Sequence, residues 1–188
     1  MARGLTSAVK TELATGNINP VLLIEIEFST PVYLTNASFD ITSSVSGTSR
    51  TYASNGHFRG ITGISETNKP TKNSLALTLS GVDQTYIALA LSENIINKEV
   101  YVYRGFLDAN QAVIADPFLL FFGTIDEFRI KDTTTKATLV LNITSHWGNF
   151  SKTSGRTTTD NSQKRFFSGD KGMEFSALSV RDIRWGRE

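Results

Sequence analysis

The sequence predicts a mainly β protein: an antiparallel β sandwich or barrel with one or two short helices and an extended C-terminal arm. Seven to nine short stretches of alternating apolar and polar residues follow one another, with turn residues between them. Helical spacing of apolar residues is confined to two short windows. Beyond residue 150 the alternation fades into a polar stretch. We therefore expect a β domain over residues 1–150 and an arm over residues 151–188.

Two windows have the apolar spacing of a helix. The first, residues 5–15, is followed by Gly16, a residue that favours helix termination. The second covers residues 84–94 and ends short of the strand expected at residue 99. The expected apolar faces repeat every four residues and consist of Leu5, Val9 and Leu13 in the first window and Ile87, Leu91 and Ile95 in the second.

Strands are expected wherever apolar and polar residues alternate. The clearest are residues 21–28 and 73–81. Residues 117–122 are apolar throughout, which predicts a central strand buried on both faces, with Gly123 as a candidate bulge. The other strands are expected at 31–35, on both sides of a turn at 46–47 within 39–52, near 56–66, and at 99–107, 123–131 and 138–145.

The chemistry that an enzyme needs is sparse in this sequence. Glu25 and Glu27 share a strand face, an arrangement that could serve a glycosidase or a hard cation. Alternation favours the simpler interpretation, in which they form the solvated face of an amphipathic strand. His57 and His146 stand far apart in the sequence, and no nucleophile elbow, phosphate loop or zinc spacing is present. We expect no catalytic residue, cofactor or metal.

The composition and charge of the chain limit the classes of partner that it can bind. The chain has 188 residues, no cysteine and a net charge of +1, which excludes a disulfide scaffold and gives no global field for nucleic acid. The longest apolar run is far shorter than a membrane helix needs. We expect neither a sequence-specific nucleic acid nor a membrane as partner. From residue 150 onward the arm has 8 basic and 5 acidic residues, which leaves 19 − 8 = 11 and 18 − 5 = 13 for the preceding chain. This asymmetry fits an arm that docks on an acidic neighbouring subunit, or ordinary solvated surface.

The segment GRTTTDNSQKRFFSGDKGMEF, residues 155–175, resembles the closing segment of tail-tip proteins of tailed bacteriophages and of related prophage and gene-transfer particles. The shared pattern consists here of Gly155-Arg156, Asp160-Asn161, Gln163, Phe166 or Phe167, Asp170, and Gly172 with Phe175. Residues 183–186, IRWG, are similar to a Trp-Gly ending in those proteins. Residues 39–66 and 72–83 resemble two of their upstream stretches in the same order. Some relatives, such as lambda-type minor tail proteins, carry a C-terminal metal–sulfur domain, whose cysteines this chain lacks.

The resemblance implies a structural protein of a phage tail tip with a tube-type β barrel and no catalysis. It implies a distal tail or baseplate hub subunit that joins the tail tube to tip fibres or a spike. The implied partners are copies of itself in a ring and the neighbouring tail tube and tail-tip proteins. A single short domain favours six-fold rings, and three-fold rings are possible. The implied location is the virion tail, assembled in the host cytoplasm.

The polar arm then becomes a predicted assembly device. Aromatic residues and arginines dominate interface energetics, so the rings are expected as buried anchors and the arginines as partners of carboxylates. The predicted subunit interface comprises Arg156, Gln163, Arg165, Phe166, Phe167, Asp170 and Trp185. In the alternative interpretation the aromatic rings complete the core of their own domain.

A competing class is a carbohydrate- or receptor-binding β module. It shares the fold and the lack of catalysis, but it would display aromatic rings on one sheet face or rim. The candidate rings are Tyr33, Tyr52, Tyr101 and Tyr103.

Overall fold

The computed structural model describes residues 5–16, 18–45, 47–63, 71–81, 85–114, 117–133, 136–151, 155 and 157–176. The chain falls into two compact units, Met1–Phe150 and Ser151–Glu188. The first unit is mainly β, as the alternation predicts. Its strands are β1 (Asn19–Ile26), β2 (Val32–Thr35), β3 (Ile41–Val45), β4 (Thr48–Tyr52), β5 (Phe58–Thr62), β6 (Ser74–Ser80), β7 (Glu99–Leu107), β8 (Phe118–Thr133) and β9 (Lys136–Thr144).

Short helices accompany the strands. Helix α1 (Ser7–Ala14) begins after Thr6, whose hydroxyl accepts a hydrogen bond from the backbone N–H of Val9. Helix α2 (Thr85–Ser92) lies between β6 and β7. A 3-10 helix, η1 (His146–Ser151), follows β9, and α3 (Asp160–Phe166) belongs to the second unit. The two predicted helices are thus confirmed, whereas η1 and α3 were not foreseen.

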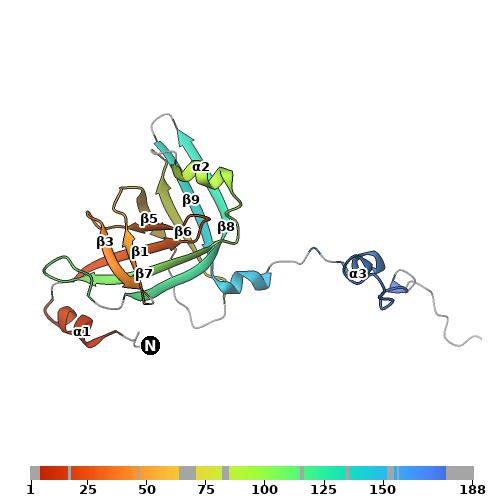
Figure 1. The fold of residues 1–188 in the computed structure, drawn as a ribbon, viewed down its shortest axis with the longest axis horizontal. Coiled ribbons are helices and arrows are strands. Elements are labelled where there is room, and N and C mark those ends of the chain that lie inside the picture. Colours follow the sequence, from red (N-terminus) through yellow and green to blue (C-terminus); the bar gives the residue numbers. More distant parts are fainter. Residues whose placement is uncertain are drawn as a thin grey trace, which may run out of the picture. The chain divides into compact units, whose positions relative to one another are not determined.

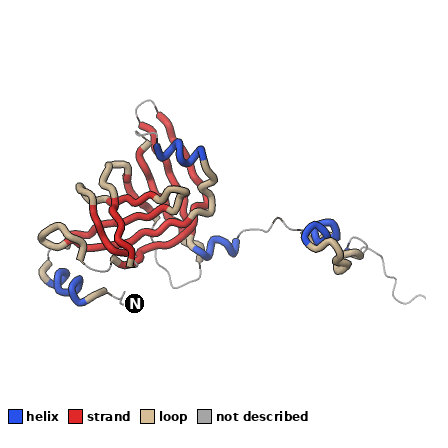
Figure 2. The backbone as a smooth tube through the Cα atoms, in the orientation of Figure 1, coloured by secondary structure: helices blue, strands red, loops and turns tan. Residues whose placement is uncertain are grey.

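Seven strands form one antiparallel sheet in the order β2-β1-β7-β8-β9-β6-β5. The sheet curls into a half-barrel (Figure 1), and Figure 2 shows how continuously the strands follow this curve. Strands β3 and β4 form a separate hairpin, with Ile41 opposite Tyr52 and Val45 opposite Thr48. The antiparallel barrel-like fold predicted from the sequence is therefore confirmed.

The main core lies on one face of the sheet. The alternating leucines of β6 are fully buried, and they meet the inward residues of β9 in register, with Leu77 opposite Leu141. Helix α2 contributes Tyr86 and Ala90 to the same core. Of the predicted face, Ile95 is buried and Ile87 is partly buried, but Leu91 is exposed. Tertiary packing selected a neighbouring stripe of this short, generally apolar helix.

The hairpin β3–β4 covers part of the opposite face. A second, smaller core forms between it and strands β1 and β7, and contains Val21, Leu23, Ile41, Val45, Tyr52 and Tyr103. Figure 1 shows the hairpin crossing these two strands. Strand β1 is consequently buried on both faces for much of its length.

The apolar run at the start of β8 differs from its prediction. It is not buried on both faces, because Leu119 is 48% exposed and its neighbours are only partly buried. The chain bulges here, between the pairs Val102–Phe121 and Tyr103–Leu119. Gly123, the predicted bulge, instead pairs regularly with Val100. A side chain there would collide with the Thr144 carbonyl oxygen and lie 2.9 Å from Ile143, so the glycine permits close strand packing.

Candidate functional site

The second unit contains all seven predicted interface residues, and five of them are among the described residues. Thr159 begins helix α3, and its hydroxyl accepts from the N–H of Ser162. Asp160 in the first turn suits the positive end of the helix dipole and accepts a hydrogen bond from Lys164 at 2.8 Å. The helix ends at Phe166, and Phe167 leaves the helical conformation. The stretch expected as an extended arm therefore includes an ordered turn of helix.

Gln163 and Asp170 are brought together. The Gln163 amide Nε2 donates to Asp170 Oδ2 at 2.5 Å, and the Gly172 N–H donates to Asp170 Oδ1 at 2.7 Å. These two hydrogen bonds, the Gln163 bond first, lower the pKa of the Asp170 carboxyl. Both residues thus have a role within their own unit, where they fix the chain that follows α3.

The aromatic rings of this unit face solvent. Phe166 is 62% exposed and Phe167 is 57% exposed, and Phe175 is more exposed still. Arg165 is exposed beside them, and it lines a shallow hollow together with Phe166 and Thr159. Within their own unit these rings are therefore not packed into a core, and neighbouring exposed rings are the kind of surface that a contact can cover. Arg156 and Trp185, the other predicted interface residues, lie outside the described residues.

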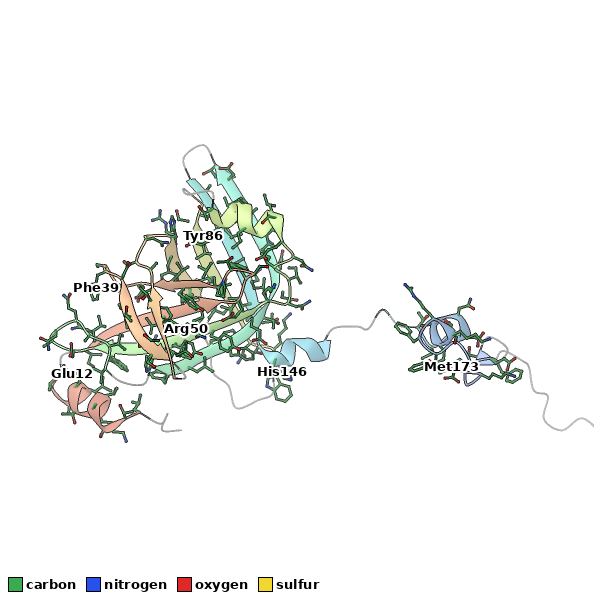
Figure 3. All side chains as sticks on the ribbon, viewed as in Figure 1. Glu12, Phe39, Arg50, Tyr86, His146 and Met173 are labelled. Atoms are coloured by element: carbon green, nitrogen blue, oxygen red, sulfur yellow. The ribbon has the colours of Figure 1, made fainter. Side chains whose placement is uncertain are left out.

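In the first unit, the carboxylate of Glu25 is only 1% exposed. The prediction of a solvated face was therefore wrong at this position, although Glu27 is partly exposed. Glu25 lies under the hairpin β3–β4, where Arg50 forms an ion pair with it and the Tyr52 hydroxyl donates to it at 2.5 Å. Figure 3 shows Arg50 where the hairpin crosses the sheet. A buried charge requires such partners.

This cluster has consistent electrostatics. Burial, and then the hydrogen bond to Glu25, raises the pKa of Tyr52 far above its usual value. The hydrogen bond to Glu25 raises the pKa of Arg50. Tyr52 therefore remains a neutral donor and Arg50 a cation at any ordinary pH. Glu25 is held by two permanent partners, which suits a structural group rather than an acid or base that exchanges protons with a substrate.

Beside this cluster lies an open hollow of about 480 Å³. Its lining includes Glu27, Lys98, Glu99, Tyr101 and Tyr103. The Tyr101 hydroxyl donates to the Glu99 carboxylate at 2.7 Å. That hydrogen bond, followed by burial, raises the pKa of Tyr101 to about 12.

The four tyrosines do not form an open platform for a sugar. Tyr52 and Tyr103 are buried. The guanidinium of Arg50 lies 5.3 Å from the centre of the Tyr33 ring, within cation–π range. Tyr101 packs between Tyr103 and Phe122, with ring centres 6.3 and 4.8 Å away. The rings expected in a glycan-binding module are thus largely occupied by neighbouring side chains.

Other site types can be addressed for the described residues. No group of three or more potential ligands for a metal ion occurs among them. Within the same ranges, no helix is long and apolar enough to cross a membrane. His57 packs edge-on against Tyr86, with ring centres 5.1 Å apart, and His146 opens η1.

The sequence analysis did not single out four residues that the structure places at or beside the Glu25 cluster and the neighbouring hollow: Arg50, Glu99, Leu119 and Phe122. Arg50 and Tyr52 are two residues apart on β4, so their side chains lie on the same face of the strand. A charge at an inward position indicates a buried partner, but its identity depends on a contact 25 residues away. The exposure of Leu119 had no signal, because an apolar run looks alike whether or not its outer face is covered.

Comparisons with known proteins bear on the fold. No protein-family model and no curated protein sequence matches the chain. Among solved structures, a chain from the virion of a native gene transfer agent (GTA) particle is similar, with a TM-score of 0.57, 11% sequence identity and 82% of this chain covered. The match covers 49% of that chain, so this protein spans about half its length. At this identity the likeness shows a shared fold.

Proposed function

We propose that this protein is a non-catalytic structural subunit of a phage-like virion tail. Its role is that of a tail-tip protein, a distal tail ring or baseplate hub that joins the tail tube to tip fibres or a spike. The observation that carries the proposal is the half-barrel fold shared with a chain of a gene transfer agent virion. The motif resemblance in residues 155–175 supports it independently of the fold.

The second unit supplies the assembly device in this proposal. A ring subunit must contact a neighbour on each side through two different surfaces. The exposed Phe166 and Phe167, with Arg165 beside them, form a surface of the kind that dominates interface energetics. Copies of the chain associate in a ring, six-fold by preference and three-fold as the other possibility. The tail tube and tail-tip proteins are its neighbours, and the virion tail is its location after assembly in the host cytoplasm.

The test is the mass of the full-length protein in solution, measured by light scattering behind size exclusion and followed by negative-stain imaging. We expect closed rings of six or three copies, and monomers when the chain is truncated after Phe150. Circular dichroism of the truncated chain checks that its β unit remains folded. Equal assembly of the two proteins would refute the role of the second unit.

The alternative function, a carbohydrate- or receptor-binding module, predicts a different result. A full-length monomer near the 20.7 kDa chain mass that binds immobilised glycans would support this alternative and overturn the ring proposal. The contacts of Arg50 with the Tyr33 ring, and of Tyr103 and Phe122 with the Tyr101 ring, disfavour it, because sugar recognition by stacking needs a free ring face.

A further inference from the structure

Next to the hairpin β3–β4, strands β7 and β8 carry an apolar area that is only partly covered. Tyr101 lies opposite Phe122, and Tyr103 lies opposite Leu119, so the four side chains share one face. Leu119 is the most exposed of them, Tyr101 and Phe122 are partly exposed, and Tyr103 is buried at the edge of the second core. We call these four residues the β7–β8 shelf.

Acidic groups border the shelf. Glu27 and Glu99 line the hollow next to Tyr101, whereas the charge of the neighbouring Glu25 is neutralised by Arg50. Glu27 forms no ion pair with another described residue, and the cations in the lining are Lys98 and the Arg50 that is paired with Glu25. The shelf therefore combines apolar contact area with two accessible carboxylates and one ammonium group.

The end of α3 offers the complementary chemistry. Arg165 has no carboxylate partner within the described chain, and it directly precedes the exposed rings of Phe166 and Phe167. A guanidinium pairs with carboxylates through two hydrogen bonds, and it does so best at the rim of an apolar contact that excludes water. The charge asymmetry of the whole chain has the same sense, since the arm is basic and the body is acidic.

We propose that the segment Arg165–Phe167 of one copy docks on the β7–β8 shelf of a neighbouring copy. Arg165 pairs with Glu27 and Glu99, and the two rings cover Leu119 and Phe122. This inference rests on the proposed function and names the receiving surface of the same interface. Donor and receiver are different patches of one chain, which is the condition for heterologous contacts that close into a ring.

The absence of cysteine in the chain allows a direct test by cross-linking. Leu119→Cys and Phe167→Cys are made in separate full-length chains with tags of different mass, and the mixture is treated with a short bis-maleimide. Both positions are exposed, and circular dichroism confirms that each variant folds. We expect the mixed product to form about tenfold faster than in the control mixture of Asp132→Cys with Phe167→Cys, because docking raises the local concentration of the two thiols.

Charge reversal tests the ion pair. Arg165→Glu in the Phe167→Cys chain, or Glu99→Arg in the Leu119→Cys chain, should each bring the rate down to the control value. Mixing the two reversed chains should restore it. Lys171→Glu, on an exposed lysine of the same unit, should leave the rate unchanged.

Three results would overturn the inference. The first is cross-linking no faster than in the control mixture, and the second is insensitivity to both charge reversals. The third is a link that forms only within a single chain carrying both cysteines, which would place the contact inside one copy. Closed rings of the wild-type protein without the cross-link would remove this docking surface and leave the proposed function standing.

Discussion

The two units of this protein place their aromatic and charged groups in opposite ways. The β unit buries aromatic rings and even a carboxylate, since Tyr52 and Glu25 are both inaccessible to solvent. The second unit is held by polar contacts such as Gln163–Asp170, and its phenylalanine rings face outward. The difference teaches that the β unit packs its aromatic and charged groups against one another, whereas the second unit keeps the rings of Phe166 and Phe167 on its own surface.

The largest effect on stability is expected when a buried ion-pair partner is removed from the β unit. Arg50→Met leaves the Glu25 carboxylate buried without its countercharge, and we expect a loss of about 3 kcal/mol in the free energy of unfolding. Urea denaturation measures it. Arg129→Met removes one member of an exposed ion pair with Glu127 and should change the stability by less than about 0.5 kcal/mol.

The double variant Arg50→Met/Glu25→Met sharpens the interpretation. Replacing both members of a buried pair by apolar groups is often close to neutral. We therefore expect it to recover most of the stability lost in Arg50→Met. A double variant as unstable as the single one would show that packing of Arg50, and not the unpaired charge, is responsible.

A smaller loss is expected at Gly123. The change Gly123→Ala places a methyl group against the Thr144 carbonyl and Ile143, and overpacking of this kind costs about 2 kcal/mol. The shift in urea midpoint should exceed that of Gly169→Ala, where an added methyl group meets no atom within 4 Å. Equal shifts would mean that β8 and β9 separate easily to accept the methyl group.

Alkaline pH tests the phenol of Tyr101, whose hydroxyl donates a hydrogen bond to Glu99. An unfolded tyrosine loses its proton near pH 10.0, whereas folded Tyr101 keeps its proton up to a pKa of about 12. As pH rises between these values the unfolded state binds fewer protons, so the free energy of unfolding falls. Urea denaturation of Tyr101→Phe across this interval should show a flatter decline than the wild-type protein. Identical curves would contradict the pKa assigned to Tyr101.

The smallest effect on stability is expected in the second unit. Phe166→Ser and Phe167→Ser remove exposed rings, and the unfolding free energy of the β unit should change by less than about 0.5 kcal/mol. The same variants should lose the oligomers that we expect for the wild-type protein in light scattering. A clear stability loss with intact assembly would reverse the comparison and place these rings in a core.

The fold could be predicted from the sequence wherever the local pattern of apolar residues matches the burial that the complete fold imposes. Leu75, Leu77 and Leu79 alternate on β6 and are all buried, as predicted. The same alternation gave a wrong prediction at Glu25. The second face of β1 is covered by the hairpin β3–β4, which follows it in the chain, and the pattern within β1 does not indicate this cover. Leu91 misled for a similar reason, since a short apolar helix offers more than one stripe to the core.

The residues of the candidate site could be singled out from the sequence, but most of their spatial arrangement could not. Phe166 and Phe167 were singled out by their polar surroundings, and their exposure agrees with an interface role without testing it. Helix α3, which ends at Phe166, had a local signal in Thr159, Asp160 and Lys164: a capping residue followed by an ion pair four residues apart. The β7–β8 shelf had none, because it is defined by which part of the sheet the complete fold covers only partly.

The strand order has a consequence for synthesis on the ribosome. Strand β1 pairs with β7, and β6 pairs with β9, so the half-barrel cannot close until residue 144 has left the exit tunnel. Helix α3 follows that point in the chain. We expect nascent chains to become protease-resistant only once β9 has emerged from the ribosome. The exposed apolar rings of Phe166 and Phe167 emerge after that point. The order of translation would then keep half-made subunits from joining one another.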